Sequence, residues 1–543
     1  MFGRDRSFGV RVGACLLAGG CIATVGHAPS SSSTALCAAV VASFGALASP
    51  PRALSPSAAG PALLERLERW SPLCALAFFL PVLFAPLAPG ADMAMHAALA
   101  RAIAQGSEML SPAWSDMQLD AYPRGFSAWL AVVAAVIGYA RASIVVSGLA
   151  FSVYYFGLRA YLGRALELPY PSLVAAFLAL GSRTPQSFYG WGGGPTAMAL
   201  GFGLLAAGEL AGALERAGSL RRLALALVAA LLLAGGVCTH PIGAGVGAAL
   251  SGIALWLRGR RALLSAAGVG VAVLLPLAPI MLWFKLQGPE LSTRELLWIQ
   301  DFQLQSDNAL GSLPAWLCPL SIWWALLTKV GPIVLIAFAL AAWAQWPTQQ
   351  GRRRVLISLG AIELLSFVVA YGHRLPVVGF LIYPSRIMPL AIPALALPIA
   401  HALANASKQG VSRRLTGVMA LATVSSLIYH VVIYQRAVPI ATAEDLQVIA
   451  CFEHRAPRDA IVDGAYGDAT QWLPALTGHQ VTHPHIHCSL FDEVEGKLEK
   501  QAPTYRFTGA RLRYGDALAT PPPKTKPVCE VGSSRIQPLA PSQ

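Results

Sequence analysis

The segment 90–125 gathers polar and charged side chains in a chain that is otherwise strongly apolar. Asp92 and His96 are four residues apart within ADMAMHAALARAIAQG, so in a helix both lie on one face. A carboxylate beside an imidazole can act on a bound group as a general base. The alternative is a solvated helix that Asp92 caps and that ends at Gly106. The other charged residues of this segment are Arg101, Glu108, Asp116, Asp120 and Arg124.

A second group of residues could hold a phosphate. His373 and Arg374 lie in the polar segment 373–385, and Arg386 follows at the start of an apolar run. A guanidinium binds phosphate through two parallel, charge-assisted hydrogen bonds, so Arg386 is a candidate phosphate clamp. An arginine at such a boundary can equally extend toward lipid headgroups without binding a substrate.

Two more cationic candidates stand next to apolar runs. Arg124 precedes the run GFSAWLAVVAAVI, and His240 lies in Thr239-His240-Pro241 between two others. Both are candidates for binding a substrate phosphate. For His240 the alternative is a tight turn between helices in which the backbone satisfies the imidazole.

The composition requires a membrane to position these residues. Of 543 residues, 55% are hydrophobic and 12% are charged, whereas a soluble domain carries about 25% charged residues. Apolar runs such as 223–237 and 263–283 are long enough to cross or nearly cross a bilayer. We therefore predict a mainly α-helical, polytopic transmembrane bundle of about 11–13 helices.

The basic residues set the expected orientation. The net charge is +13, and the excess of Lys and Arg lies before residue 436. It falls in short segments, 216–222, 258–261, 352–354 and 408–414, which the positive-inside rule places in the cytoplasm as loops. The same rule puts 90–125 and the region after 435 outside the cytoplasm. Membrane topology therefore explains the positive net charge, which does not indicate nucleic-acid binding. We expect residence in a bacterial inner membrane, with membrane lipids as neighbours.

Three parts follow from this topology. We expect N-terminal helices in 1–70, a transmembrane core in 71–435 with outer loops 90–125, 285–313 and 373–385, and an extracytoplasmic domain in 436–543. Predicted spans of the core include 71–89, 195–214, 223–238, 241–257, 355–371 and 386–406. Between 126 and 194 three apolar stretches must make an even number of crossings, so one is interfacial or re-entrant. Glu209, deep in an apolar span, is expected near the cytoplasmic end or paired with an arginine.

The last part of the chain changes character. Short apolar runs alternate with polar residues, and the Pro-rich PPPKTKP comes near the end. This predicts a small α/β domain with a disordered end. Outside the cytoplasm, Cys451, Cys488 and Cys529 allow one disulfide and leave one thiol. His479, His483, His485 and His487 are a weaker metal-binding candidate, because no carboxylate or cysteine spacing completes a site.

Several short motifs, in order along the chain, resemble the glycosyltransferase C superfamily. They are the first outer loop with its DxxxH spacing, Asp116 and AYPRGFSAW, then YGWGGGP (189–195), CTHP (238–241), YPSRIMP (383–389) and DGAYGDATQWLPALTG (463–478). The glycine-rich motif lacks the spacing of a nucleotide-binding loop, and its glycines favour close packing before Pro195.

The resemblance implies an integral membrane enzyme that takes a sugar from a polyprenyl-phosphate carrier with inversion. It implies that Asp92 is the catalytic base or a ligand of a divalent metal, Mg²⁺ or Mn²⁺, with Asp116 as a second acidic residue. Transfer to a hydroxyl needs such a carboxylate, and the leaving phosphate needs positive charge. The alternative is a transporter or flippase for a lipid-linked or polar solute. Transporters place their polar residues at the bilayer midplane and often have a repeated half, whereas this chain has its polar residues in outer loops.

Overall fold

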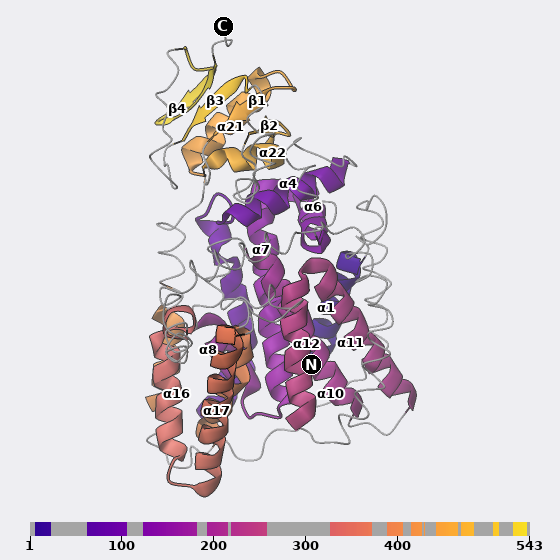
Figure 1. Ribbon diagram of the computed structural model, residues 1–543, viewed down its shortest axis with the longest axis vertical. Helices are drawn as coiled ribbons and strands as arrows, with labels where there is room; N and C mark the ends of the chain where they lie inside the picture. Colours follow the sequence, from indigo (N-terminus) through magenta and orange to yellow (C-terminus); the bar gives the residue numbers. More distant parts are fainter. Residues whose placement is uncertain are drawn as a thin grey trace.

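The computed structural model describes residues 6–22, 62–105, 123–181, 193–214, 219–257, 326–371, 388–404, 414–425, 441–464, 468–482, 503–509 and 525–539. These residues are mostly helical, and a small sheet lies at one end of the molecule (Figure 1). The helices before the sheet are α1 (Arg6–Ile22), α3 (Ala62–Trp70), η2 (Ser71–Leu83), α4 (Ala91–Gln105), α6 (Gly125–Ile137), α7 (Tyr139–Ala160), η4 (Tyr161–Ala165), α8 (Pro171–Leu180), α10 (Gly194–Leu214), α11 (Ser219–Thr239), α12 (Pro241–Leu257), η6 (Leu326–Val330), α16 (Pro332–Gln345), α17 (Gln349–Tyr371), η9 (Met388–Ala391) and α19 (Ile392–Ala404).

Helix α10 is the centre of the bundle, and glycines let its neighbours approach. A Cβ atom at Gly201 would lie 2.6 Å from the backbone of α7, and one at Gly203 would lie 2.5 Å from Gly247 of α12. Small residues at such crossings allow dispersion contacts between backbones, which stabilise helix packing where the hydrophobic effect is absent. Nearly every residue of α10 is buried, as an apolar helix at the middle of a bundle requires.

Three of the described helices are long and apolar enough to cross a membrane. They are Tyr139–Ala165, Gly194–Leu214 and Arg222–Thr239. The last two match the predicted spans 195–214 and 223–238. Shorter apolar helices occupy several other predicted positions, including Gly243–Ala254 and Met388–Ala404.

Helix α6 has both ends near α4. Its first turn contacts His96, and Tyr139, two residues after its end, lies with its ring centroid 6.0 Å from the Arg101 guanidinium. Helix α7 then runs away from α4, and α8 follows it. Of the three apolar stretches in 126–194, only the one in Tyr139–Ala165 forms a helix long enough to span a membrane, and Gly125–Ile137 and Pro171–Leu180 are shorter apolar helices.

Three expected elements differ from the sequence prediction, and one is the basic loop 216–222, of which Arg221 and Arg222 lie in the first turn of α11. The span 71–89 is a 3₁₀ helix that ends at Leu83, because Pro81 lacks an N–H donor and Pro86 and Pro89 prevent continuation. The basic residues 352–354 are not in a loop but in the first turns of α17. The hydroxyl of Thr348 accepts a hydrogen bond from Gly351 N–H at 3.0 Å and so starts the helix before them.

The C-terminal part is a mixed α/β unit at the α4 end of the bundle (Figure 1). Its sheet has the order β2-β1-β3-β5-β4, with β1 parallel to β2 and β3, and β5 antiparallel to β3 and β4. A Thr442–Asp445 capping box starts α21. The elements are α21 (Ala443–Arg455), β1 (Ile461–Asp463), η10 (Ala469–Trp472), α22 (Leu473–Leu476), β2 (Gln480–Val481), β3 (Tyr505–Thr508), β4 (Cys529–Val531) and β5 (Ser534–Pro538).

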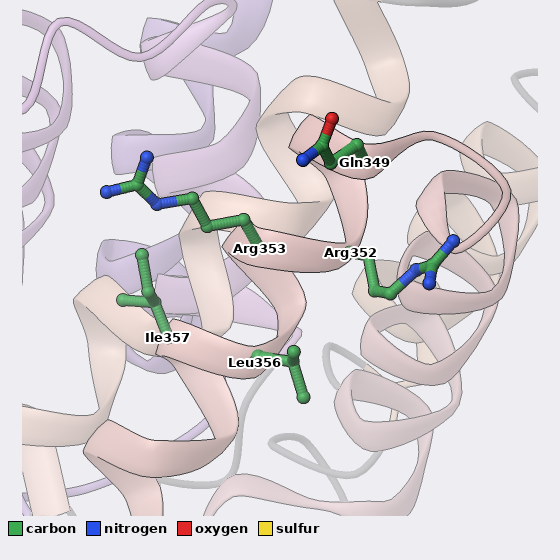
Figure 2. Close-up of a pocket in the computed structure, with 5 residues that line it drawn as sticks. All are labelled: Gln349, Arg352, Arg353, Leu356 and Ile357. Atoms are coloured by element: carbon green, nitrogen blue, oxygen red, sulfur yellow. The ribbon is translucent and has the colours of Figure 1, made fainter.

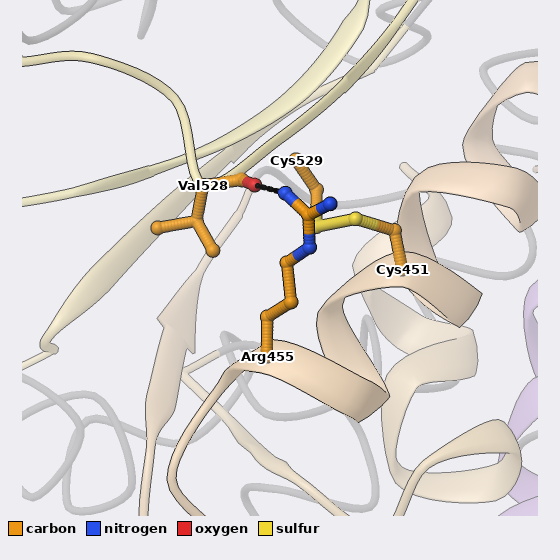
Figure 3. Close-up of a disulfide and its surroundings, with 4 residues drawn as sticks. All are labelled: Cys451, Arg455, Val528 and Cys529. Carbon is orange, nitrogen blue, oxygen red and sulfur yellow. Dashed lines mark hydrogen bonds between the residues drawn. A yellow bond between two sulfur atoms is a disulfide. The ribbon is translucent and has the colours of Figure 1, made fainter.

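Near the end of the chain the structure describes residues 525–539, and the rest of the end that was expected to be disordered lies outside the described residues. Residues 525–539 contain the β4–β5 hairpin, which completes the sheet. A disulfide joins Cys451 of α21 to Cys529 of β4, and beside it Arg455 donates a hydrogen bond to the carbonyl of Val528 at 3.0 Å (Figure 3). Buried Ile536 adds an apolar contact. These three anchors outweigh the polar, Pro-rich composition of the approach to the hairpin.

Candidate functional site

Asp92 lies in the first turn of α4. The helix begins after Gly90, whose φ of 102° suits glycine, and the N–H of Met93 donates to the Gly90 carbonyl at 3.1 Å. The Asp92 side chain is half-buried. The predicted short helix ending before Gly106 is confirmed.

His96 lies one turn further along α4 and faces α6. Its side chain is 1% exposed. Its Nδ1 is 3.3 Å from the hydroxyl of Ser127, and its ring packs edge-on against Phe126 with centroids 5.3 Å apart. These contacts fix the rotation of α4 about its axis, and with it the direction in which Asp92 points.

The start of α6 is the meeting point of four segments. A Cβ at Gly125 would lie 2.9 Å from the carbonyl oxygen of Cys238 at the end of α11. A Cβ at Gly194, the first residue of α10, would lie 3.0 Å from Phe126 and 3.6 Å from Met93 of α4. The expectation that the glycines before Pro195 allow close packing therefore holds for Gly194.

Arg124 and His240 both stand at this meeting point. Arg124 immediately precedes Gly125 and is half-buried. His240 follows Cys238 by two residues, is 8% exposed, and accepts a hydrogen bond through Nδ1 from the N–H of Gly243 at 3.2 Å. That bond caps α12, as expected if His240 stands in a tight turn where the backbone satisfies the imidazole. The start of α6 thus lies next to His96 through Phe126 and Ser127, and its Gly125 lies next to Cys238, two residues before His240.

Arg101, which the sequence did not single out, joins α4 to the C-terminal unit. Its guanidinium donates to the carbonyls of Ala475 and Leu476 at 3.2 and 2.8 Å and to that of Thr477 at 3.2 Å. These carbonyls end α22 and have no hydrogen-bond donor within the helix, so the guanidinium supplies the missing donors. Arg101 lies nine residues after Asp92, so the two side chains point to opposite sides of α4. The His96 side of α4 therefore faces α6, and the opposite side carries Arg101, which contacts both α22 and the Tyr139 ring.

The segment 468–478 of the C-terminal unit, which contacts α4, is tightly buried. Gln471 and Trp472 are fully buried in η10, which packs against α4. Among the described residues, the Gln471 amide and the Trp472 indole N–H have no hydrogen-bond partner. Burial also lowers the pKa of His479, and the nearby charge of Arg101 acts in the same direction. The His479 Nε2 lies 3.1 Å from the carbonyl of Pro457, and its Nδ1 lies 2.9 Å from the hydroxyl of Thr477.

Several predicted site residues lie outside the described residues. They are Asp116, His373, Arg374 and Arg386, together with His483, His485 and His487. Within the described part of the chain, no three His, Cys, Asp or Glu side chains are grouped as metal ligands require. Of the predicted metal ligands, Asp92 and His479 lie in the described residues.

A second polar site lies in the bundle, remote from α4. Glu209 of α10 is 3% exposed, and its Oε1 is 2.9 Å from Arg11 Nε and 2.7 Å from Arg164 Nη1. The predicted pairing of Glu209 with arginine is confirmed. One carboxylate thus joins α1, α10 and η4.

No protein-family model matches the sequence, and no curated protein matches it. Among solved structures, the chain is similar to the crystal structure of the Archaeoglobus fulgidus oligosaccharyltransferase in complex with Zn and sulfate. The match covers 81% of this chain and 67% of that one, with 11% sequence identity and a TM-score of 0.42. At this TM-score the likeness carries no conclusion about function, so the residues of the chain itself have to carry it.

Proposed function

We propose that the chain is a membrane glycosyltransferase that moves a sugar from a polyprenyl-phosphate carrier to a hydroxyl acceptor at the α4 end. The observation that carries the proposal is the arrangement around Asp92. A half-buried carboxylate stands at the start of a helix that packs against the bundle on one face and against the C-terminal unit on the other. Cationic side chains for a phosphate, Arg124 and His240, stand nearby.

The proposed reaction uses Asp92 as the general base. Its carboxylate takes the proton of the acceptor hydroxyl as the oxygen attacks the anomeric carbon of the sugar. The bond from that carbon to the phosphate oxygen breaks, the configuration inverts, and polyprenyl phosphate leaves. His96 is a positioning residue in this scheme, because it is buried against Ser127 and reaches Asp92 only through the helix.

Positive charge must stabilise the leaving phosphate. Arg124 and His240 are candidates at the start of α6, and Arg386, Arg374 and His373 remain candidates from the sequence. In the alternative role of Asp92, its carboxylate would be a ligand of a divalent cation, Mg²⁺ or Mn²⁺, which would supply further stabilisation of the phosphate.

The reaction is proposed to occur outside the cytoplasm of a bacterial inner membrane. The Cys451–Cys529 disulfide supports this side for the C-terminal unit, because disulfides persist in oxidising compartments. The arginines of α17 lie at the opposite end of the molecule (Figure 1), as cytoplasmic residues would.

The test measures polyprenyl phosphate released by purified protein from a panel of polyprenyl-phosphate monosaccharides in nanodiscs. We expect Asp92→Asn to lower the release roughly 100-fold or more, because general-base catalysis contributes that much. Asp459→Asn, an exposed carboxylate in the C-terminal unit, is the matched control and should keep full activity.

Two results would count against the proposal. Undiminished release by folded Asp92→Asn protein would remove Asp92 as the base. Transbilayer movement of an intact lipid-linked sugar, without release of carrier phosphate, would favour the flippase alternative.

A further inference from the structure

A shallow, open pocket lies on the first turns of α17, at the end of the molecule farthest from the sheet (Figures 1 and 2). Its volume is about 770 Å³, and its lining residues are Gln349, Arg352, Arg353, Leu356 and Ile357. None of these five side chains is acidic. Both arginines are exposed, and Leu356 and Ile357 are 53% and 50% exposed.

The lining side chains form two ridges, each polar at the start of the helix and apolar one turn later. Gln349, Arg353 and Ile357 follow one another at intervals of four residues, and so do Arg352 and Leu356. Figure 2 shows the arginines projecting on either side of the pocket, with Ile357 and Leu356 one turn beyond them. This order of charge and apolar surface matches an amphiphile whose anionic headgroup continues into an acyl chain.

The surroundings place the pocket at the level of lipid headgroups. Trp343 and Trp346, just before α17, are 67% and 46% exposed, and Trp346 lies with its ring centroid 6.0 Å from the Arg352 guanidinium. Exposed tryptophans gather where a membrane meets water. Further along α17, Leu364 is 67% exposed, as a side chain facing acyl chains would be.

We propose that this pocket binds one anionic phospholipid, with its phosphate on Arg352 or Arg353, whose guanidiniums project to opposite sides (Figure 2), and an acyl chain along Leu356 or Ile357 one turn later. The guanidiniums supply the charge, because the N–H of Gly351 at the helix start is already bonded to Thr348. The proposal is independent of the glycosyltransferase function. It concerns the end of the molecule opposite to Asp92.

The test is native mass spectrometry of the full-length protein in neutral detergent, titrated with phosphatidylglycerol or phosphatidylcholine. We expect phosphatidylglycerol to be retained roughly tenfold or more tightly than phosphatidylcholine, since each arginine near a membrane surface adds attraction for anionic lipid. Arg352→Gln combined with Arg353→Gln should remove most of this preference. Arg66→Gln combined with Arg69→Gln, on exposed residues of α3 outside the pocket, removes equal charge and should leave the preference nearly unchanged.

A second variant tests the apolar half of the pocket. Leu356→Asn combined with Ile357→Asn should weaken retention of phosphatidylglycerol but leave any competition by inorganic phosphate unaltered. The proposal is overturned if both double variants in α17 retain phosphatidylglycerol like the wild type. It is equally overturned if the Arg66→Gln/Arg69→Gln control lowers the preference for phosphatidylglycerol as much as Arg352→Gln/Arg353→Gln does, because the preference would then follow net charge and not the pocket.

Discussion

Replacement of Arg101 by alanine tests whether α4 and the C-terminal unit act as one body. The side chain makes three hydrogen bonds to the carbonyls that end α22, and its guanidinium also lies 6.0 Å from the Tyr139 ring centroid. A hydrogen bond from a charged group contributes about 1.5–3 kcal/mol. Because two of the bonds are 3.2 Å long and the side chain is partly exposed, we expect Arg101→Ala to cost about 2–4 kcal/mol of docking free energy.

This loss should be visible in amide hydrogen exchange of residues 468–482. A cost of about 2–4 kcal/mol raises the population of the undocked state roughly 30-fold to several hundred-fold, and exchange should accelerate accordingly. Arg101→Lys should recover part of the protection, because lysine offers one point charge where arginine offers a planar fork.

The matched control is Arg455→Ala. Arg455 also donates to a backbone carbonyl, that of Val528, but within the C-terminal unit and on its exposed surface. It should change exchange in 468–482 little. Unaltered exchange in Arg101→Ala would refute the reasoning, because the domain would then be held by apolar contacts of η10 and α22 alone.

Two further predictions concern buried ionisable groups. Glu209→Ala should lower the free energy of unfolding by about 3–5 kcal/mol, because Arg11 loses a buried partner. Thermal unfolding in detergent measures this loss. Arg164→Ala should lower the free energy of unfolding by less, since the Arg164 side chain is 37% exposed. The lowered pKa of His479 means that, below its ordinary value of 6.5, an unfolded C-terminal unit takes up a proton that the folded unit resists, so stability should fall as the pH drops below that value. A melting temperature measured from pH 7.5 to 5.5 should decline less in His479→Gln than in the wild type, and equal declines would contradict the assignment.

Helix positions were largely readable from the sequence. Apolar runs predicted α10, α11 and α12 because a segment buried on all sides must be apolar throughout. The helix that carries Asp92 was readable from its glycine limits. The 3₁₀ form of 71–83 and the start of α17 before Arg352 were not, because proline strain and a threonine cap act locally against the hydropathy pattern.

The site was readable in part. The four-residue spacing placed Asp92 and His96 on neighbouring positions of α4, yet it did not show that His96 would be buried against Ser127. The contact of Arg101 with the C-terminal unit could not be predicted, because its partners are backbone carbonyls, which every residue carries and no side-chain pattern marks. The Cys451–Cys529 pairing was one of three that the late cysteines allowed.

The sequence by itself determined the class of this protein, because its apolar runs are too long and too numerous for a soluble domain. The free energy gained by burying a segment depends on its composition and on the periodicity of its apolar residues, so it can be predicted from the sequence alone. Only the tertiary structure decided which distant groups meet, namely Glu209 with Arg11 and Arg164, and Arg101 with the end of α22. Hydrogen bonds and ion pairs act over a few ångströms in space, so their partners depend on how the helices pack.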